Sequence, residues 1–100
     1  MSYLVRIRPE AERDVRDAVS WHEEQRAGLG RELVLELDAV YERLAENPRL
    51  YADIHRGIRR AIVRRFPYGV FYLVTGTEVR VIAVVDMARN PSLWQDRADA

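Results

Sequence analysis

The sequence predicts an α+β domain in which an N-terminal strand is followed by an antiparallel α-hairpin and then by a three-stranded antiparallel β-meander. Apolar residues recur every three or four positions between residues 9 and 45, as in amphipathic helices. The glycines Gly28 and Gly30 interrupt that pattern once. Beyond residue 56 the pattern changes to runs rich in valine, isoleucine and aromatic residues, which is typical of strands.

The N-terminal half predicts one short strand and two helices. Residues 3–8 alternate in polarity, so we expect a strand with one buried face at an edge of the sheet that the sequence does not identify. Pro9 ends this strand and suits the first turn of a helix, which we expect over residues 9–26. A second helix extends to about Ala45, where Asn47-Pro48 stops it. Because the link between the helices is short, they must lie antiparallel.

Three further strands are predicted after a loop over residues 48–55, at about 57–66, 69–75 and 78–86. The two-residue link Gly76-Thr77 favours a tight hairpin between the last two strands. Both of these strands are apolar on either side, as expected of central strands covered from two directions. The α-hairpin covers only one face of the sheet. The other face must therefore meet the C-terminal tail, a second copy of the chain or a partner.

Composition and charge exclude several classes of function. A chain of 100 residues supports one hydrophobic core, so we expect a single domain over residues 1–100. It has no cysteine and two isolated histidines, and we expect no disulfide, metal site or cofactor. The net charge is zero, which argues against direct sequence-specific DNA binding by this chain alone. No apolar run suits a membrane helix and no export signal is visible, which indicates a cytoplasmic protein.

The candidate binding surface is the segment 56–65, in which five of ten residues are arginine. An arginine on a strand presents a rigid fork of donors that suits phosphate and carboxylate groups. Strict alternation places Arg60 and Arg64 on one face and Arg59 and Arg65 on the other, and a bulge or an edge position would reconcile these mixed faces. The alternative is that the arginines form salt bridges with the acidic helices.

The aromatic residues and the C-terminal tail are given mainly structural roles. We expect Trp94 to anchor the tail against the sheet and Arg97 to pair with an acid or with the target. The aromatics near the arginine segment are expected to pack in the core, and base stacking is the alternative. These aromatics are Phe66, Tyr68, Phe71 and Tyr72.

The polar residues of the helices also have a structural interpretation. Glu10, Glu12 and Asp14 predict a solvated face of the first helix. His22 lies on the apolar stripe of that helix, so we expect a partly buried packing residue. His55 is expected to be a solvated loop residue.

Five short motifs occur within this order of elements: Asn47-Pro48-x-x-Tyr51, Gly57-Ile58-Arg59-Arg60, Arg65-Phe66-Pro67-Tyr68, Phe71-Tyr72 and Arg89-x-Pro91-x-x-Trp94-x-x-Arg97. Together they resemble the RelE/ParE superfamily of toxins from bacterial type II toxin-antitoxin systems, over nearly the whole chain. They are more similar to the ParE, or plasmid-stabilisation, branch than to the RelE branch.

The resemblance implies a growth-arresting toxin that is neutralised by a cognate antitoxin, whose C-terminal segment wraps around it. The two branches differ in their targets. RelE-like toxins cut messenger RNA in the ribosome, whereas ParE-like toxins poison DNA gyrase. Fold alone does not choose between these targets.

The chemistry of the residues favours the second target. Cleavage of RNA through the 2′-hydroxyl needs a general base, a general acid and cations, and this sequence supplies only the cations convincingly. We therefore predict a gyrase inhibitor that acts by binding, and we assign no catalytic residue. A ribosome-dependent mRNA endonuclease is the alternative, and a member that retains only antitoxin binding is a third reading. The residues assigned to target binding are Arg59, Arg60, Arg64, Arg65, Arg89, Trp94 and Arg97, and the antitoxin-binding residues are left open.

Overall fold

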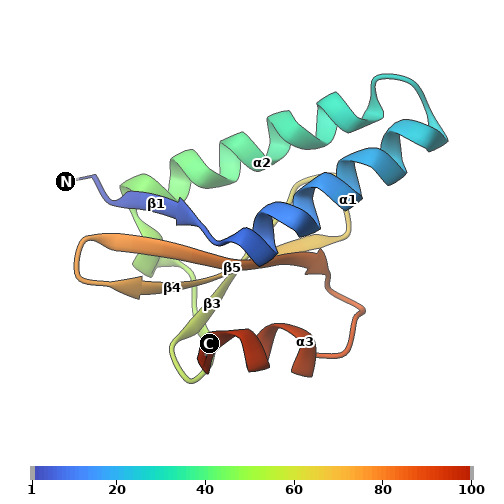
Figure 1. Cartoon of the computed structure of the whole chain (residues 1–100). Coiled ribbons are helices and arrows are strands. Elements are labelled where there is room, and N and C mark those ends of the chain that lie inside the picture. The colour runs from blue at the N-terminus through green and yellow to red at the C-terminus, as the bar shows by residue number, and fades with distance from the viewer. Residues whose placement is uncertain (1, 100) are drawn as a thin grey trace.

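The computed structural model describes residues 2–99, which form a five-stranded sheet with a helical hairpin on one face and a short helical tail on the other (Figure 1). This is the predicted α+β arrangement. The elements, in chain order, are β1 (Leu4–Ile7), α1 (Pro9–Gln25), α2 (Leu29–Glu46), η1 (Pro48–Leu50), β2 (Asp53–His55), β3 (Ile58–Ile62), β4 (Tyr68–Thr75), β5 (Glu78–Asp86), α3 (Ser92–Gln95) and η2 (Asp96–Asp99).

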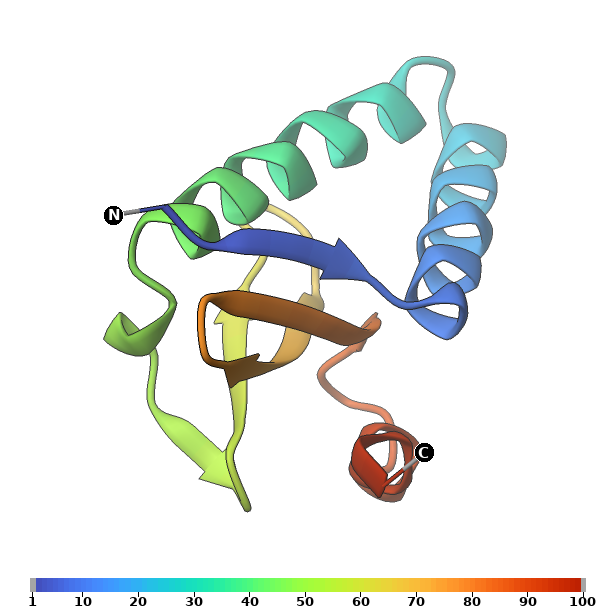
Figure 2. The same ribbon diagram turned by 60° about the vertical axis from the view of Figure 1, so that its left-hand side comes forward.

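The strands lie in the order β1-β5-β4-β3-β2. The predicted antiparallel meander is confirmed as β3, β4 and β5. Its last hairpin turns through Gly76, whose φ of +61° lies in the left-handed region that glycine adopts readily. β1 joins the edge beside β5 and runs parallel to it, with Leu4 opposite Glu78 and Ile7 opposite Val81 (Figure 2).

The helical hairpin is held together at its loop by one carboxylate. The chain turns through Gly28, which has a φ of +89°. Glu23 in α1 then caps α2, because its carboxylate accepts hydrogen bonds from the N–H groups of Gly28 and Gly30, each at 3.0 Å. At Gly30 the helices approach closely, and a Cβ there would lie 2.9 Å from the carbonyl oxygen of Val19. In the described part of the chain, no helix is long and apolar enough to cross a membrane.

Apolar side chains cover both faces of the sheet, as the composition of its central strands predicted. Leu33, Leu37 and Tyr72 belong to the layer beneath the helices. A bulge in β5, where Phe71 pairs with Ala83 but Tyr72 pairs with Val81, gives β5 one extra residue. The layer on the opposite face consists of Ile58, Phe71, Ile82, Ala83, Val85 and Trp94.

One aromatic contact and one ion pair attach the C-terminal tail. Trp94 is buried and stacks on Phe71 with a ring-centroid distance of 4.5 Å, which confirms its predicted role as an anchor. Arg97 donates hydrogen bonds to the carboxylate of Asp14 at 2.6 Å and to the carbonyl of Ile82 at 3.1 Å. Because Asp14 lies on α1, this pair connects the tail to the helices as well as to the sheet.

The predicted strand over 57–66 was too long. β3 ends at Ile62, so Arg64 and Arg65 lie in an exposed turn and not on a strand. Arg65 has a φ of +70°, which no strand residue adopts. The N–H of Val63 closes the turn on the carbonyl of Tyr68 at 2.9 Å.

The predicted loop over 48–55 was also wrong, because it contains η1 and β2. The chain returns from β2 to β3 through Arg56 and Gly57, whose φ values of +46° and +88° suit a tight two-residue hairpin. His55 therefore lies on β2 and not in a solvated loop. Its ring centroid is 6.1 Å from that of Trp94.

The buried Tyr72 and the partly buried Tyr41 predict a loss of stability at high pH. Burial raises the pKa of both Tyr41 and Tyr72 to about 12, from a usual value of about 10. An unfolded chain would release these protons at a lower pH than the folded chain. Their contribution to stability is thus complete below about pH 10 and is lost as the pH rises towards about 12. We expect the free energy of unfolding, measured with urea and circular dichroism, to fall across this range.

Tyr72→Phe is the matched variant, because it removes the ionisable group and keeps the aromatic ring. It also removes the hydrogen bond that the Tyr72 hydroxyl donates to the carbonyl of Pro48 at 2.6 Å, so stability at pH 7 should fall by about 1 kcal/mol. Between about pH 10 and 12 its stability should decline less steeply than that of the parent chain. Equal slopes for the two proteins would contradict this account.

The pair Asp14–Arg97 predicts a measurable coupling between α1 and the tail. The two side chains are only 15% and 19% exposed. In a double-mutant cycle with Asp14→Asn and Arg97→Met, we expect a coupling of about 1–3 kcal/mol in the free energy of unfolding. The control cycle uses Arg26 and Glu32, an exposed pair at 2.9 Å that should give under about 1 kcal/mol. A coupling no larger than that of the control would mean that the ion pair does not hold the tail.

Candidate functional site

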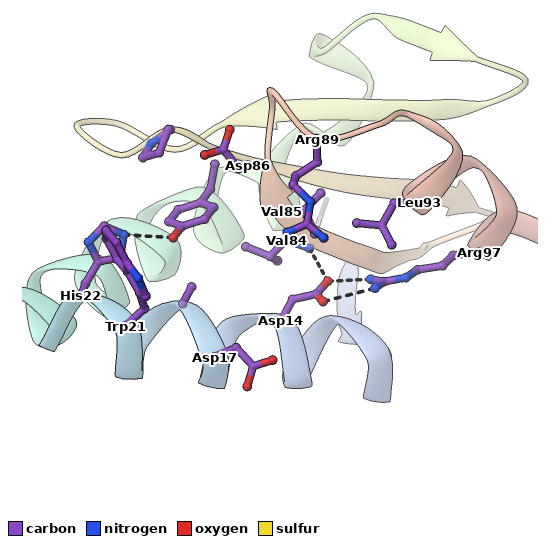
Figure 3. Close-up of a pocket in the computed structure, with 13 residues that line it drawn as sticks. Asp14, Asp17, Trp21, His22, Val84, Val85, Asp86, Arg89, Leu93 and Arg97 are labelled. Atoms are coloured by element: carbon purple, nitrogen blue, oxygen red, sulfur yellow. Dashed lines mark hydrogen bonds and ion pairs between the residues drawn. The ribbon is translucent and has the colours of Figure 1, made fainter. Parts of the chain in front are cut away.

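A cleft of about 510 Å³ opens at the C-terminal end of β5, between α1 and the tail (Figure 3). One wall is α1, and the opposite wall is the segment that leads from β5 into α3. The turn that contains Pro67 and Tyr68 closes one end. The lining combines apolar and aromatic groups with five charged side chains, Asp14, Asp17, Asp86, Arg89 and Arg97.

The cleft exists because β5 extends beyond β1. The last pair between the two strands joins Ile7 to Val81, and Pro9 then starts α1. Two side chains take the place of the missing strand. Asp14 accepts the N–H of Val84 at 3.0 Å, and Arg97 donates to the backbone of β5 nearby. The open edge of the sheet is therefore partly satisfied by side chains.

The rest of this edge faces the cleft. Residues of β5 alternate between hydrogen bonding to β4 and pointing away from it. Because the N–H of Val84 bonds to Asp14 and not to β4, this alternation directs the carbonyl of Val84 and the N–H of Asp86 away from β4 as well. These groups form the kind of edge to which an extended segment of another chain adds as a strand.

An aromatic cluster forms the closed end of the cleft. His22 is 8% exposed, and its Nε2 atom lies 3.0 Å from the hydroxyl of Tyr68. The rings of Trp21 and Phe66 meet the imidazole edge-on at centroid distances of 4.8 and 5.1 Å. Burial, and then the charge of Asp86, raises the pKa of Tyr68, so this phenol is neutral at physiological pH. Trp21 itself is 55% exposed, which places a large apolar surface at the rim.

The charged side chains of the cleft differ in their pairing. Asp14 and Arg97 neutralise each other, and Asp86 accepts the N–H of Ala88 at 2.8 Å. The side chains of Asp17 and Arg89 make no hydrogen bond or ion pair among residues 2–99. Figure 3 shows Arg89 pointing into the cleft from the segment after β5. The cleft can thus contact both apolar and charged groups of a partner.

Only some of the predicted site residues lie together. Arg89 and Arg97 line the cleft, and Trp94 is buried behind it against the sheet. Arg97 pairs with an acid, which was one of its two predicted roles. The four arginines of the segment 56–65 that were assigned to target binding, Arg59, Arg60, Arg64 and Arg65, lie elsewhere.

Two of those four arginines are held by internal partners. Arg59 donates to the backbone carbonyls of Arg49 and Tyr51. Arg65 pairs with Glu32 at 2.9 Å and with a second glutamate of α2, so the predicted salt bridge to the acidic helices is confirmed here. Hydrogen bonds from Arg65, and then from Arg26, lower the pKa of Glu32.

The other two arginines are available. Arg60 pairs with Phe71 across the ladder and so lies on the tail face of the sheet. Its aliphatic part covers Gly69, where a Cβ would come within 3.1 Å of it. Arg64 is exposed in the turn. Neither Arg60 nor Arg64 has a polar partner in the described part of the chain.

Most of the cleft was not predicted from the sequence. Asp14 was assigned to a solvated helix face, but its side chain is 15% exposed and carries the ion pair to the tail. The signal was present in the helical stripe, because Asp14, Ala18 and His22 recur at a spacing of four residues. His22 is the buried packing residue that this stripe predicted. The position of Val84 at an open edge depends on where β1 ends, and no local pattern shows that.

The sequence and the fold of this chain are both similar to those of known proteins. Residues 5–91 match the family described as "ParE toxin of type II toxin-antitoxin system, parDE". A search of curated proteins gives no significant match. A chromosomal ParDE toxin-antitoxin system from P. aeruginosa is structurally similar, with a TM-score of 0.75 and 13% identity over 85% of this chain and 96% of that chain. The toxin-antitoxin complex RelBE2 from Mycobacterium tuberculosis is also structurally similar. Its TM-score is 0.63, with 23% sequence identity over 86% of this chain and 99% of that chain.

At these identities the two solved structures show the fold alone, and they confirm the predicted RelE/ParE arrangement. The sequence match extends from β1 to the residues just before α3. It therefore includes the α-hairpin, the whole sheet and the segment after β5 that lines the cleft. The chain belongs to the ParE toxin family of type II toxin-antitoxin systems.

Proposed function

We propose that this toxin inhibits DNA gyrase by binding to it, and that a cognate antitoxin neutralises the toxin by occupying the cleft beside β5. The family match over residues 5–91 is the observation that carries this proposal. Both similar solved structures come from toxin-antitoxin systems, which supports an antitoxin partner. The proposal implies a cytoplasmic protein and, where the gene pair lies on a plasmid, a role in plasmid stabilisation.

The distribution of the arginines supports binding over RNA cleavage. A cleavage site gathers its cations around one phosphate. Here Arg59 donates hydrogen bonds to backbone carbonyls. Arg65 forms an ion pair with a glutamate of α2, and Arg97 forms one with an aspartate of α1. Arg60, the unpaired arginine of β3, lies on the opposite face of the sheet from Arg59. These side chains serve different surfaces, which suits a protein that docks by several separate contacts.

The cleft supports the antitoxin part of the proposal. Its open strand edge offers the carbonyl of Val84 and the N–H of Asp86 to an extended segment. Trp21 at the rim offers apolar surface, and aromatic anchors of this kind often carry much of the binding energy of an interface. Asp17 and Arg89 offer charges of opposite sign on the two walls. We infer that the antitoxin segment adds as a strand and covers Trp21.

In a supercoiling assay with purified gyrase, we expect the toxin to inhibit in a dose-dependent manner. Arg89→Ala should raise the half-inhibitory concentration about fivefold or more, which corresponds to about 1 kcal/mol of binding. Arg31→Ala is the matched control, because Arg31 is an exposed arginine on the opposite helix. If the toxin changes neither the supercoiling rate nor the DNA cleavage rate of gyrase, while it still arrests growth in cells, gyrase is rejected as the target.

The same preparation distinguishes the alternative enzyme. Primer extension on translated transcripts should show no new cuts when the toxin is added to a translation reaction. Cuts that appear only on translated transcripts would establish the mRNA endonuclease in place of the gyrase inhibitor.

Trp21→Ala tests the antitoxin surface. We expect the dissociation constant for the antitoxin, measured by calorimetry, to rise at least about tenfold, because the variant loses the aromatic side chain that the antitoxin would cover. Leu35→Ala is the matched control: Leu35 is 56% exposed and Trp21 is 55% exposed, but Leu35 lies on α2 outside the cleft. Thermal melting confirms that each variant is folded. If the two variants bind the antitoxin equally well, the cleft is not its docking surface.

A further inference from the structure

A second cavity, of about 450 Å³, lies where β1 pairs with β5. Its lining contains three arginines and one glutamate, and these are Arg6, Arg8, Arg80 and Glu78. Val79 and Val81 belong to the layer beneath the helices, so Arg80 between them lies on the other face of the sheet. None of these residues lines the cleft described above.

Two arginines are placed side by side here by the strand register. Arg6 lies directly opposite Arg80 in the parallel pair of β1 and β5. Like charges at directly opposite positions destabilise a sheet. A single carboxylate offsets the repulsion. Glu78 accepts a hydrogen bond from Nε of Arg6 at 2.9 Å and from Nε of Arg80 at 2.8 Å.

The bridging carboxylate also orients the two guanidinium groups. Hydrogen bonds from Arg80, and then from Arg6, lower the pKa of Glu78, so the carboxylate is ionised at neutral pH. Each arginine is held at Nε only, and the Nη groups of both have no partner within residues 2–99. Arg6 is 64% exposed and Arg80 is 49% exposed, so a ligand can reach them. Glu78 is the one carboxylate that Arg6 and Arg80 share, so these two arginines together keep one excess positive charge, whereas Arg8 pairs with Glu10 at 3.7 Å.

We propose that this cavity binds a phosphate group through the free Nη edges of Arg6 and Arg80. Neighbouring strands are about 4.8 Å apart, so two guanidinium forks on them can donate to different oxygens of one tetrahedral anion. The rigid fork of arginine suits phosphate, and the strands fix the position of each fork. The phosphate is either a free ion or part of a nucleic-acid backbone, where it adds a contact that does not depend on base sequence. The inference is independent of the proposed gyrase target.

Binding is measured by NMR of the arginine Nε–H groups in the folded toxin. Sodium phosphate is titrated into the toxin at constant ionic strength. Separate control titrations use sodium acetate and sodium chloride. We expect saturable shifts of the Arg6 and Arg80 signals with phosphate and smaller, unsaturated shifts with acetate or chloride. Absence of saturation with phosphate, or equal responses to the three anions, would overturn the proposal.

Variants give the second readout. Arg6→Ala and Arg80→Ala should each weaken phosphate binding about tenfold or more, whereas Arg31→Ala, which removes an exposed arginine of α2, should leave it unchanged. Arg80→Lys keeps the charge beside Glu78 and loses the planar fork, so it should also weaken binding. Equal affinity of Arg80→Lys and the parent chain would reject the fork geometry. A parallel titration with an eight-nucleotide thymidine strand identifies the source, because tighter binding than inorganic phosphate indicates a nucleic-acid backbone and weaker binding indicates the free ion.

Discussion

The unequal lengths of β1 and β5 are the constraint from which most of this structure follows. β1 has four residues and β5 has nine, so the second half of β5 has β4 on one side and no strand on the other. Unpaired backbone groups in a partly buried position are costly. The chain meets this cost with Asp14 and Arg97, which bond to the β5 backbone and to each other. The same contacts hold the tail in place, and both side chains line the cleft.

The arginines fall into two groups, those bound to partners within the fold and those whose side chains remain free to contact other molecules. Arg59, Arg65 and Arg97 each connect two segments of the chain, and their charge is satisfied within the fold. Arg64 and Arg89 remain open to other molecules. The chain is neutral overall, but its free cations lie on particular surfaces. A partner with matching acidic groups would therefore be oriented as well as attracted.

The sequence was sufficient to predict the order of the elements, because helices and central strands have strong periodic patterns. It did not predict β2, which has three residues and no period to detect. It placed Arg64 and Arg65 on a strand because alternation continues through Val63, whereas a left-handed residue and Pro67 form a turn there. The cleft was not predicted for a different reason. Its residues come from α1, β5 and the tail, and their meeting depends on where β1 stops, which is a property of the assembled sheet.

The pairing of the first strand with the last has a consequence for how the chain acquires its fold. Asp14 and Arg97 are separated by 83 positions, and β1 pairs with β5 across most of the sequence. Contacts between such distant segments raise the contact order, which slows folding. During translation β1 and the helical hairpin emerge before β2 to β5, so the apolar side of the hairpin at first lacks most of the sheet against which it packs. The newly made toxin therefore completes this edge of the sheet only after Arg97 has left the ribosome, and until then the edge lacks one of its two side-chain partners.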